Sequence, residues 1–279
     1  MTESTVLVTA ATGRSGRRVA HLLRTRGVPS RPAWRSAPRP FDWHDRTTWP
    51  AVLDGCSAAY LCYSPDLALP GADAVIAEFT AAAVEHGLHR LVLLSGRGEA
   101  GARACERIVL DAPVASTVVR CAWFQENFSE HFLRAGVLAG RIAMPAGAVT
   151  EPFVGLDDVA EIAVRALTTD GFDGQVLELT GPESIGFARV AQILSATLDR
   201  EIVYRPVDVA AFVDEAVTAG MERADAEGLG ELFGDVLDGR NAATTDTVER
   251  VLGRPPTTFE LFARRAAAGG AWALAGAVR

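Results

Sequence analysis

The chain has 279 residues, a formal net charge of −8 and 27 basic side chains, every one of which is an arginine. The absence of lysine excludes a P-loop lysine, a Schiff-base lysine and any Tyr-x-x-x-Lys catalytic pair. With 49% hydrophobic and 22% charged residues, the composition indicates a globular protein with a sizeable core, in one large domain or one domain with an appendage. The acidic balance, without any basic run, argues against nucleic acid as a partner.

The four cysteines are far apart and form no C-x-x-C pair. Because Cys56, Cys62, Cys105 and Cys121 lie mostly within apolar runs, they are typical of buried free thiols in a reducing compartment. The sequence shows no signal-peptide pattern and no apolar stretch long enough to span a bilayer. We therefore expect a cytoplasmic protein without a membrane partner.

In the first half of the chain, short β-branched runs alternate with helical patterns. The predicted strands are 5–9, 28–34, 58–63, 90–95 and 115–120, the second of them interrupted by prolines. The predicted helices are 15–26, 72–86 and a segment around 103–110. This alternation predicts a parallel sheet with helices on both faces.

The second half has a different texture. Helices are predicted at 155–167 and 187–198, and short strands at 176–179 and 201–205. From Val209 onward the pattern is mostly helical, with breaks at Gly220, Gly228, Gly239 and Gly253. Thr257 and Glu260 have capping-box spacing ahead of the last helix. We expect an α/β fold of the Rossmann type, a doubly wound parallel sheet with a smaller, mostly helical C-terminal cap.

The strongest motif is VTAATGRSGRRVA, from Val8 to Ala20. It follows a buried strand and opens a helix, which is the context of a dinucleotide-binding loop. Gly13 is expected to permit the tight turn, and Gly16 to let the start of the helix approach the ligand. Ala10 occupies the place of the first glycine of the three-residue-spaced variant of this loop. The alternative is a strand–loop–helix unit without a ligand.

The end of the second predicted strand bears on the choice of nicotinamide cofactor. An acidic residue there would bind the ribose 2′-hydroxyl of NAD, but the chain has Trp34, Arg35 and Ser36, with Arg31 nearby and Arg14 in the loop. A planar, multidentate guanidinium suits a 2′-phosphate. The sequence therefore predicts NADP(H), with a solvated Arg35 at the strand end as the alternative.

Taken together, these residues resemble the NmrA-like family of atypical short-chain dehydrogenases, relatives of festuclavine dehydrogenase and NAD(P)H:quinone reductases. The resemblance covers nearly the whole chain. It is carried by VTAATGRSG (8–16), FDWHDRTTW (41–49), HRLVLLSGRG (89–98), VVRCAWFQENF (118–128), FVGLDDVAEIAVRAL (153–167), LELTGPESIGFARVAQILSATLDR (177–200) and RVLGRPPTTFELFAR (250–264). It implies a dinucleotide-binding core over residues 1–180, with a cap contribution around 140–155, and a smaller α/β cap on the substrate side over 181–279.

The resemblance also implies a set of cofactor-binding residues. The pyrophosphate loop would comprise Ala10, Thr12, Gly13, Arg14, Ser15 and Gly16, while Arg35 and Ser36 would bind the 2′-phosphate and Asp42 and Trp43 the adenine. Tyr63, Ser64 and Pro65 would meet the cofactor ribose, and Ser95 and Gly96 would lie near the nicotinamide. Cys121 departs from the family, whose members have proline after the arginine that corresponds to Arg120.

Reduction of a carbonyl needs an acid for the developing alkoxide. The three tyrosines are Tyr60, Tyr63 and Tyr204, and none lies in the helix after Ser95, where tyrosine-dependent relatives place theirs. Hydride addition to an iminium carbon needs no acid, and reduction of a quinone gives an anion that solvent protonates. An iminium, quinone or conjugated carbonyl acceptor is therefore favoured over a simple ketone.

The polar candidates for catalysis are Ser95, Tyr63 and Asn127. Ser95 ends a strand, where open α/β sheets bind ligands, but its hydroxyl is equally suited to capping the next helix. A substrate pocket is expected at Trp123, Phe124, Asn127 and Phe128, with core packing as the alternative for each. Tyr204 lies on a cap strand and is interpreted as structural.

Other polar residues are interpreted as structural. Asp157 and Asp158 open a helix, where carboxylates stabilise free N–H groups. Glu106 is a possible acid, but a solvated helix face is the preferred interpretation. No metal site is predicted, because His86 and His89 lack the spacing of zinc ligands, and no G-x-S-x-G elbow supports hydrolysis.

Three functions fit the sequence. The first is an NADPH-dependent reductase of a small or aromatic molecule, in secondary metabolism. The second is a redox-sensing regulator that binds the dinucleotide without turnover, and the third is a non-redox epimerase or cyclase. The sequence leaves the oligomeric state open, either monomer or homodimer.

Overall fold

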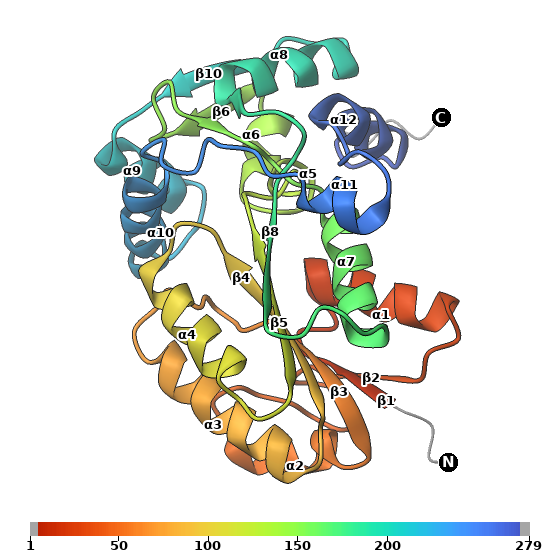
Figure 1. The fold of residues 1–279 in the computed structure, drawn as a ribbon. Coiled ribbons are helices and arrows are strands. Elements are labelled where there is room, and N and C mark those ends of the chain that lie inside the picture. The colour runs from red at the N-terminus through yellow and green to blue at the C-terminus, as the bar shows by residue number, and fades with distance from the viewer. Residues whose placement is uncertain (1–4, 274–279) are drawn as a thin grey trace. The chain divides into compact units, whose positions relative to one another are not determined.

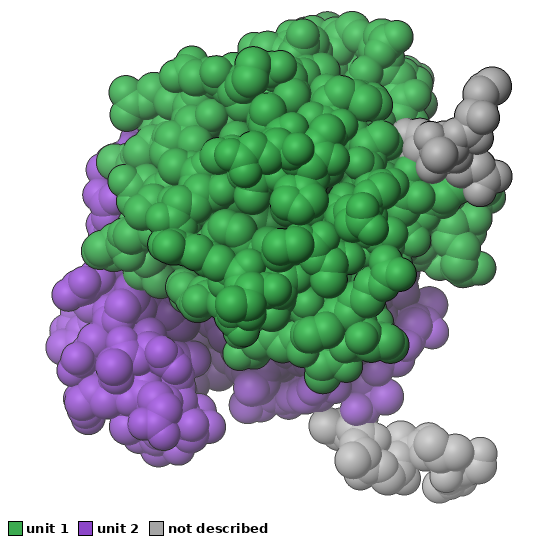
Figure 2. Space-filling view, turned by 90° about the horizontal axis from the view of Figure 1, so that it is seen from below, with its two compact units in different colours: residues 1–121, 156–179, 246–254 green, residues 122–155, 180–245, 255–279 purple. Residues whose placement is uncertain are grey.

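The computed structural model describes residues 5–273 and divides the chain into two compact units. Unit 1 contains residues 1–121, 156–179 and 246–254, and unit 2 contains 122–155, 180–245 and 255–279 (Figure 2). The chain therefore passes from one unit to the other five times. The predicted domain boundary after residue 180 stays a prediction. The two compact units are a different division of the chain, because each consists of three segments that alternate along the sequence.

Unit 1 is built around a six-stranded sheet in the order β2-β1-β3-β4-β5-β8, in which every neighbouring pair is parallel. The strands are β1 (Thr5–Val8), β2 (Ser30–Pro32), β3 (Cys56–Leu61), β4 (Arg90–Gly96), β5 (Ala115–Cys121) and β8 (Gln175–Leu179). Their residues are mostly buried, as expected of a parallel sheet covered on both faces. The strand order reverses at β1, so that the carboxyl ends of β1 and β3 form a topological switch point.

Helices lie on both faces of this sheet (Figure 1). The helices of unit 1 are α1 (Arg14–Thr25), α2 (Trp49–Leu53), α3 (Ala72–Glu85), α4 (Ala100–Leu110), α7 (Leu156–Thr168) and α11 (Thr247–Leu252), with a short 3-10 turn, η1 (Arg46–Thr48). Helix α7 packs against α1, α11 and the central strands, and α3 packs against α2 and α4 on the other face. Residues from β1, β3, β4 and the α2–α4 side form one hydrophobic core. The predicted doubly wound parallel sheet is confirmed.

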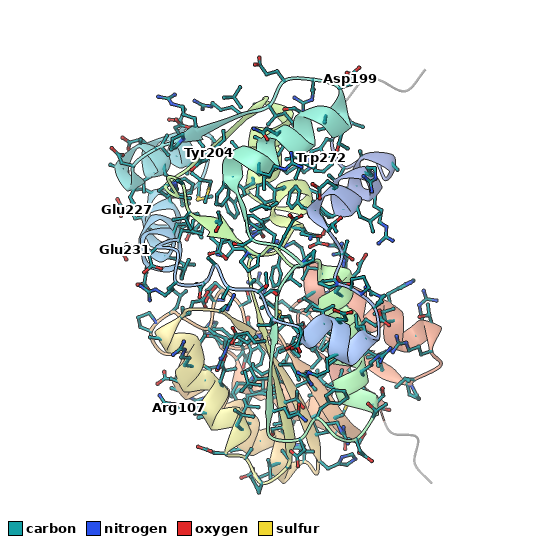
Figure 3. The ribbon with its side chains drawn as sticks, turned by 45° about the horizontal axis from the view of Figure 1, so that its top comes forward. Arg107, Asp199, Tyr204, Glu227, Glu231 and Trp272 are labelled. Carbon is teal, nitrogen blue, oxygen red and sulfur yellow. The ribbon has the colours of Figure 1, made fainter. Side chains whose placement is uncertain are left out.

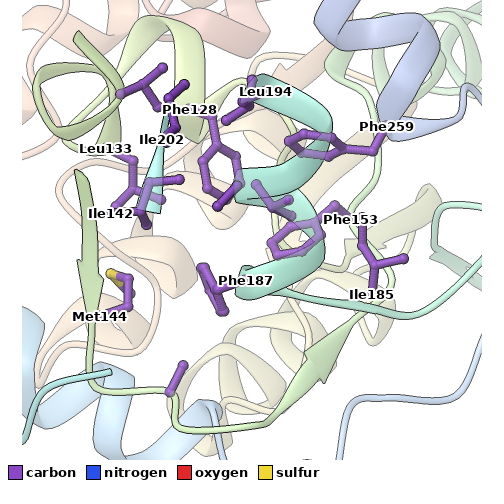
Figure 4. Packing of buried hydrophobic residues seen from close by; sticks show 14 of the residues in the cluster. Phe128, Leu133, Ile142, Met144, Phe153, Ile185, Phe187, Leu194, Ile202 and Phe259 are labelled. Carbon is purple, nitrogen blue, oxygen red and sulfur yellow. The ribbon is translucent and has the colours of Figure 1, made fainter. Parts of the chain in front are cut away.

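Unit 2 has only two-stranded sheets among the described residues, and most of its regular structure is helical. Its strands form two pairs, a parallel one between β6 (Arg141–Met144) and β10 (Val203–Pro206) and an antiparallel one between β7 (Thr150–Glu151) and β9 (Ile185–Gly186). Its helices are α5 (Asn127–Glu130), α6 (Leu133–Leu138), α8 (Phe187–Leu198), α9 (Val209–Thr218), α10 (Arg223–Val236) and α12 (Phe259–Ala268). Their apolar faces bury an aromatic core that includes Phe128, Phe153, Phe187 and Phe259 (Figure 4).

Two local predictions about the second half are wrong. Gly228 does not break the helix, because it lies inside α10. The last helix is capped by Thr258, whose hydroxyl oxygen accepts from the backbone N–H of Leu261 at 3.1 Å, and Thr257 therefore lies one position before the cap. Glu260 instead pairs with Arg189 at 3.2 Å.

No helix within residues 5–273 is long and apolar enough to cross a membrane. Over the same residues, no group of three or more His, Cys, Asp or Glu side chains has an arrangement that would hold a metal ion. All four cysteines are free thiols.

Candidate dinucleotide and substrate sites

The loop between β1 and α1 has its unusual backbone at Ala10 and not at Gly13. Ala10 has φ +47°, in the left-handed region that an alanine adopts at a cost of about 1–2 kcal/mol. Gly13 has φ −75°, and its N–H donates to the Ala10 carbonyl at 2.8 Å, which closes the turn. The left-handed backbone of the turn is therefore at Ala10, and Gly13 closes the turn through its N–H.

Gly16 is required by close packing within the loop. A Cβ built at Gly16 would lie 2.7 Å from the carbonyl carbon of Ala10 and 2.8 Å from the Thr9 oxygen. At Gly13 the nearest atom to such a Cβ would be the Ala10 oxygen, at 3.1 Å. The first turn of α1 thus rests directly on the loop backbone, and only glycine fits at its third position.

The start of α1 carries features that favour an anion. Its N-cap is Gly13, which has no side chain to satisfy the first N–H groups, and the first turn contains no acidic residue. The helix dipole adds partial positive charge at this end. Arg14 is half-buried at the first position of the helix, and Thr12 is exposed beside it.

Side chains from the loop bind it to β3 at the switch point. The Thr9 hydroxyl donates to the Tyr60 carbonyl at 3.0 Å and accepts from the Cys62 N–H at 2.8 Å. The buried Ser15 hydroxyl donates to the Cys62 sulfur at 3.5 Å. Burial raises the pKa of the Cys62 thiol, which is therefore neutral and an inert part of this scaffold.

Of the arginines near the end of β2, one is engaged elsewhere. Arg31 donates to the carbonyls of Val52 at 2.8 Å and Asp54 at 2.5 Å, and so satisfies the carboxyl end of α2. Arg35 and Ser36 are exposed in the turn that follows β2. Within residues 5–273, Arg35 makes no ion pair and no hydrogen bond that would occupy its guanidinium.

Trp43 is a core residue. Its side chain is 5% exposed, packs edge-on against Phe79 with ring centroids 4.8 Å apart, and donates its indole N–H to the Cys62 carbonyl at 3.2 Å. This packing leaves the ring little surface on which an adenine would stack. Asp42 is half-buried, and its Oδ1 accepts from the His44 N–H at 2.9 Å.

The segment after β3 places Tyr63 beside these aromatics, with its ring centroid 5.3 Å from that of Trp43. Tyr63 is half-buried, and burial raises the pKa of its hydroxyl, which makes it a weaker acid. Ser64 and Pro65 are exposed and are joined by a cis peptide bond.

Ser95 belongs to a buried network at the carboxyl end of β4. Its hydroxyl donates to Glu106 Oε1 at 2.6 Å, and the same oxygen accepts from Arg120 Nε at 2.9 Å. Arg120 also pairs with the second Glu106 oxygen and with Glu178 Oε2, the latter at 3.3 Å. The paired carboxylates raise the pKa of Arg120.

This network corrects two interpretations. Glu106 is 2% exposed and ion-paired, so that it does not lie on a solvated helix face. Ser95 donates its proton to a carboxylate and does not cap α4, whose N-cap is Glu99. Glu178 was missed by the sequence analysis, although its place in β8, beside Arg120 in the register, would have indicated it.

In unit 2, the predicted pocket residues have different surroundings. Trp123 and Phe124 are half-exposed, and Asn127 is 8% exposed. Phe128 is fully buried, and the centroid of its ring lies 5.4 Å from that of Phe153 and 5.3 Å from that of Phe259. It is therefore a core residue and does not line a pocket. Its carbonyl accepts the indole N–H of Trp272 at 2.8 Å (Figure 3 labels Trp272).

Two aromatic residues beside Trp123 were missed. Phe233 lies 5.0 Å from Trp123 and is stacked on half-exposed Phe132 at 5.4 Å between ring centroids. The helical spacing between Phe128 and Phe132 was the available signal. Phe233 comes from α10, distant in sequence, and no local pattern linked it to Trp123.

The interpretation of Tyr204, Asp157 and Asp158 as structural fits their contacts. The Tyr204 hydroxyl donates to the Gly147 carbonyl at 2.9 Å, and its ring stacks on Phe187 (Figure 3 labels Tyr204). Asp157 pairs with Arg18 at 2.8 Å, and buried Asp158 pairs with Arg254 at 2.8 Å. The two carboxylates therefore serve two separate ion pairs.

Known proteins resemble the chain over nearly its full length. It is 30% identical to festuclavine synthase II of Penicillium roqueforti over 92% of this chain and 96% of that protein. It is 28% identical to the NAD(P)H azoreductase of Xenophilus azovorans over 94% and 98% of the two chains. No protein-family model matches the chain.

Solved structures share the fold. The Citrobacter sp. triphenylmethane reductase complexed with NADP(H) superposes with a TM-score of 0.82, at 21% identity, over 94% of this chain and 99% of that one. NmrA, a negative transcriptional regulator solved in complex with NAD, gives a TM-score of 0.71 at 16% identity, over 97% and 98%.

Proposed function

The chain belongs to the NmrA-like family of atypical short-chain dehydrogenases, and from this premise we propose that it is an NADPH-dependent reductase of a small or aromatic acceptor. The observation that carries the proposal is the start of α1, which lies at the switch point of a parallel sheet and is suited to bind an anion. Its N-cap, Gly13, has no side chain to cap the first N–H groups, its first turn contains no acidic residue, and Arg14 adds positive charge. Two similar proteins, an azoreductase and a triphenylmethane reductase, are reductases by name.

In this proposal the described residues of unit 1 hold NADP(H). The first N–H groups of α1, from Gly13 to Gly16, would bind the pyrophosphate, with Arg14 adding charge, and the segment Tyr63 to Pro65 would meet the ribose. When bound, NADPH supplies a hydride. Trp43 would support the adenine end of the site from the core, where it packs against Phe79, and the half-buried Asp42 would be a hydrogen-bond partner of the adenine.

We further propose that Arg35 selects NADPH over NADH by pairing with the 2′-phosphate, with Ser36 beside it. The support is that Arg35 is exposed in the turn after β2, where no carboxylate would bind a free 2′-hydroxyl. The Arg35→Ala variant should lose about tenfold or more in affinity for NADPH while its affinity for NADH stays unchanged. Equal losses for both cofactors would contradict this assignment.

The acceptor is proposed to need no strong acid. Ser95 is committed as a donor to Glu106, and Tyr63 has a raised pKa, so neither is well suited to protonate an alkoxide. An iminium, a quinone or a conjugated carbonyl is therefore the proposed class of acceptor. Within unit 2 taken by itself, the half-exposed Trp123 and Phe132 offer aromatic surface against which a flat molecule would pack. Asn127, a polar residue of the same segment, is 8% exposed and remains the proposed polar contact for the acceptor.

The test is NADPH consumption against a panel of iminium compounds, quinones and enones, followed at 340 nm. Oxidation of NADPH by at least one class supports the reductase. Tight NADPH binding without oxidation would favour the second candidate function, a dinucleotide-sensing regulator. The support for this candidate is the fold that the chain shares with NmrA. A product with the mass of its substrate would indicate an epimerase or cyclase. We propose a cytoplasmic location, on the four free thiols.

A further inference from the structure

The turn of residues 42–45 lies directly beside the end of β2. The Trp34 carbonyl, next to Arg35, accepts the backbone N–H of Phe41 at 3.1 Å, so the residues that precede Arg35 and the turn are hydrogen-bonded to each other. In a dinucleotide fold the 2′ position of the ribose lies at the end of this strand. The base is attached to the adjacent carbon of the same ribose. With the 2′-phosphate on Arg35, we therefore expect the base at the turn of residues 42–45.

This turn is closed by its own hydrogen bonds and is anchored to α2. The Asp42 carbonyl accepts the Asp45 N–H at 3.3 Å, and Asp42 Oδ1 accepts the His44 N–H at 2.9 Å, which is the pattern of an Asx turn. Trp49 of α2 donates its indole N–H to the same carbonyl at 2.9 Å. The exposed His44 is therefore presented from a backbone that the core holds in place.

Two aromatic rings with exposed surface meet at the turn. His44 is exposed and Tyr63 is half-buried, and their ring centroids are 6.3 Å apart with the ring planes at 75°. The Trp43 ring, which is 5% exposed, has its centroid 5.3 Å from that of Tyr63 and supports this ring from the core. His44 and Tyr63 thus form an aromatic corner, in which a flat base stacked on one ring meets the other ring edge-on.

The turn also offers a polar partner for the edge of a base. The half-buried Asp42 uses Oδ1 within the turn, and no group among residues 5–273 donates to its Oδ2. A carboxylate oxygen accepts from the amino group of adenine, whereas it has no donor to accept from at the corresponding carbonyl of an oxopurine. The chemistry at this turn therefore suits an aminopurine.

We propose that His44 and Tyr63 are the residues on which the adenine of NADP(H) stacks. The inference rests on the proposed function, because it takes Arg35 as the residue that binds the 2′-phosphate. The family resemblance implied Trp43 for the adenine, but the core covers that ring, and the exposed aromatic surface is that of its two neighbours in space. Stacking contributes to the affinity for the adenine half of the cofactor and takes no part in hydride transfer.

The test measures binding of separate halves of the cofactor by isothermal titration calorimetry. The probes are 2′,5′-ADP, 5′-ADP, which lacks the 2′-phosphate, and reduced nicotinamide mononucleotide, which lacks the base. The variants are His44→Ala and Tyr63→Leu, which remove a ring, and His44→Phe and Tyr63→Phe, which keep one. The matched control is His89→Ala, an exposed histidine at the amino end of β4, on the opposite edge of the sheet. Far-UV circular dichroism reports folding.

We expect H44A to bind 2′,5′-ADP and 5′-ADP about fivefold more weakly, and Y63L about tenfold more weakly. H44F, Y63F and H89A should stay within about twofold of the unsubstituted protein, and no variant should change the affinity for the mononucleotide. Proton NMR gives an independent signature, because a stacked adenine has its H2 and H8 resonances shifted upfield by the ring current. Both variants that remove a ring should reduce this shift.

Unchanged binding of 2′,5′-ADP by H44A would overturn the inference, and so would an equal loss in H44F and H44A, since the ring itself would then contribute nothing. Either result leaves the proposed dinucleotide site intact, because the Arg35→Ala variant tests that site separately and should weaken 2′,5′-ADP without affecting 5′-ADP. An unsubstituted protein that binds neither 2′,5′-ADP nor NADPH would overturn the proposed function. Should Y63L fail to fold, the exposed position of His44 lets H44A decide the outcome.

Discussion

Ala10 stores conformational strain in the loop that we propose for the pyrophosphate. Its φ of +47° is a conformation that glycine adopts freely and alanine does not. The neighbouring Gly13 and Gly16 relieve steric contacts with the Ala10 carbonyl group instead of supplying backbone freedom. The glycines of a loop are therefore not interchangeable, and the strained position is the one without glycine.

Replacing Ala10 by glycine should stabilise the fold. Relief of the left-handed alanine is worth about 1–2 kcal/mol, and the greater freedom of glycine in the unfolded chain offsets about 0.4–1 kcal/mol of it. We expect a gain of roughly 0.5–1 kcal/mol in the free energy of unfolding in urea. The control, Ala11→Gly, lies at a position without positive φ and should lose roughly 0.5–1 kcal/mol. A destabilised A10G variant would contradict the strain.

Gly16→Ala should disrupt NADPH binding more than Gly13→Ala. The first substitution forces a Cβ into the carbonyl groups of Thr9 and Ala10, whereas the second meets one carbonyl oxygen at 3.1 Å. We expect G16A to raise the dissociation constant of NADPH at least tenfold and G13A to raise it less. Isothermal titration calorimetry with both folded variants measures this difference, and equal effects would argue against the packing of α1 on the loop.

At the scale of elements, one buried carboxylate joins α4 to two neighbouring strands. Glu106 comes from α4, Ser95 from β4 and Arg120 from β5, and Glu178 of β8 extends the network to the sheet edge. Because the charges are paired within a largely buried site, removing one partner leaves the other without compensation.

The Glu106→Ala variant should lose about 2–4 kcal/mol in the free energy of unfolding, since Arg120 would keep only Glu178 and the Ser95 hydroxyl would lose its acceptor. Glu106→Gln keeps an acceptor for Ser95 and should lose less. Chemical unfolding in urea measures both. A loss below about 1 kcal/mol for E106A would be typical of a surface ion pair and would contradict the buried network.

Helix α4 also carries a thiol that couples stability to pH. Burial, followed by the charge of Asp73, raises the pKa of Cys105 from 9.0 to about 11. The thiol stays neutral in the fold while it ionises in the unfolded chain, so its stabilising contribution is complete below pH 9 and is lost as the pH rises to about 11. Cys105→Ala should therefore show a smaller loss of stability between pH 8.5 and 11, with a slope that differs by at most about 1.4 kcal/mol per pH unit. Parallel slopes for both proteins would refute this coupling.

Sequence patterns predicted the regular elements of the sheet well, because a buried parallel strand such as β4 contains a continuous apolar run, here residues 91–94. They did not predict α6 and β6, which are six and four residues long and depend on contacts with distant segments. In the candidate dinucleotide site, the places of the β1–α1 loop and of Arg35 could be predicted, because each comes directly after a strand in the sequence. The burial of Trp43 and Glu106 does not, because it depends on Phe79 and Arg120, which no local pattern brings to them.

At the scale of the whole chain, the units are interleaved, and a single cut does not separate them. A fragment of residues 1–180 would contain the sheet but lack α11, whose neighbour Arg254 pairs with buried Asp158. It would also carry Phe128 and Phe153 without Phe187 and Phe259. We expect it to bind the dye ANS strongly and to unfold without a sharp transition. A cooperative transition like that of the full chain would support an independent core over 1–180.

The interleaving also sets an order of events during synthesis. Phe128 and Phe153 leave the ribosome roughly a hundred residues before Phe259, which packs against both of them. At about 5–20 residues per second, this interval is on the order of ten seconds. Throughout that time the nascent chain holds an incomplete aromatic core. The protein is therefore expected to need protection by chaperones until its last helix has been made.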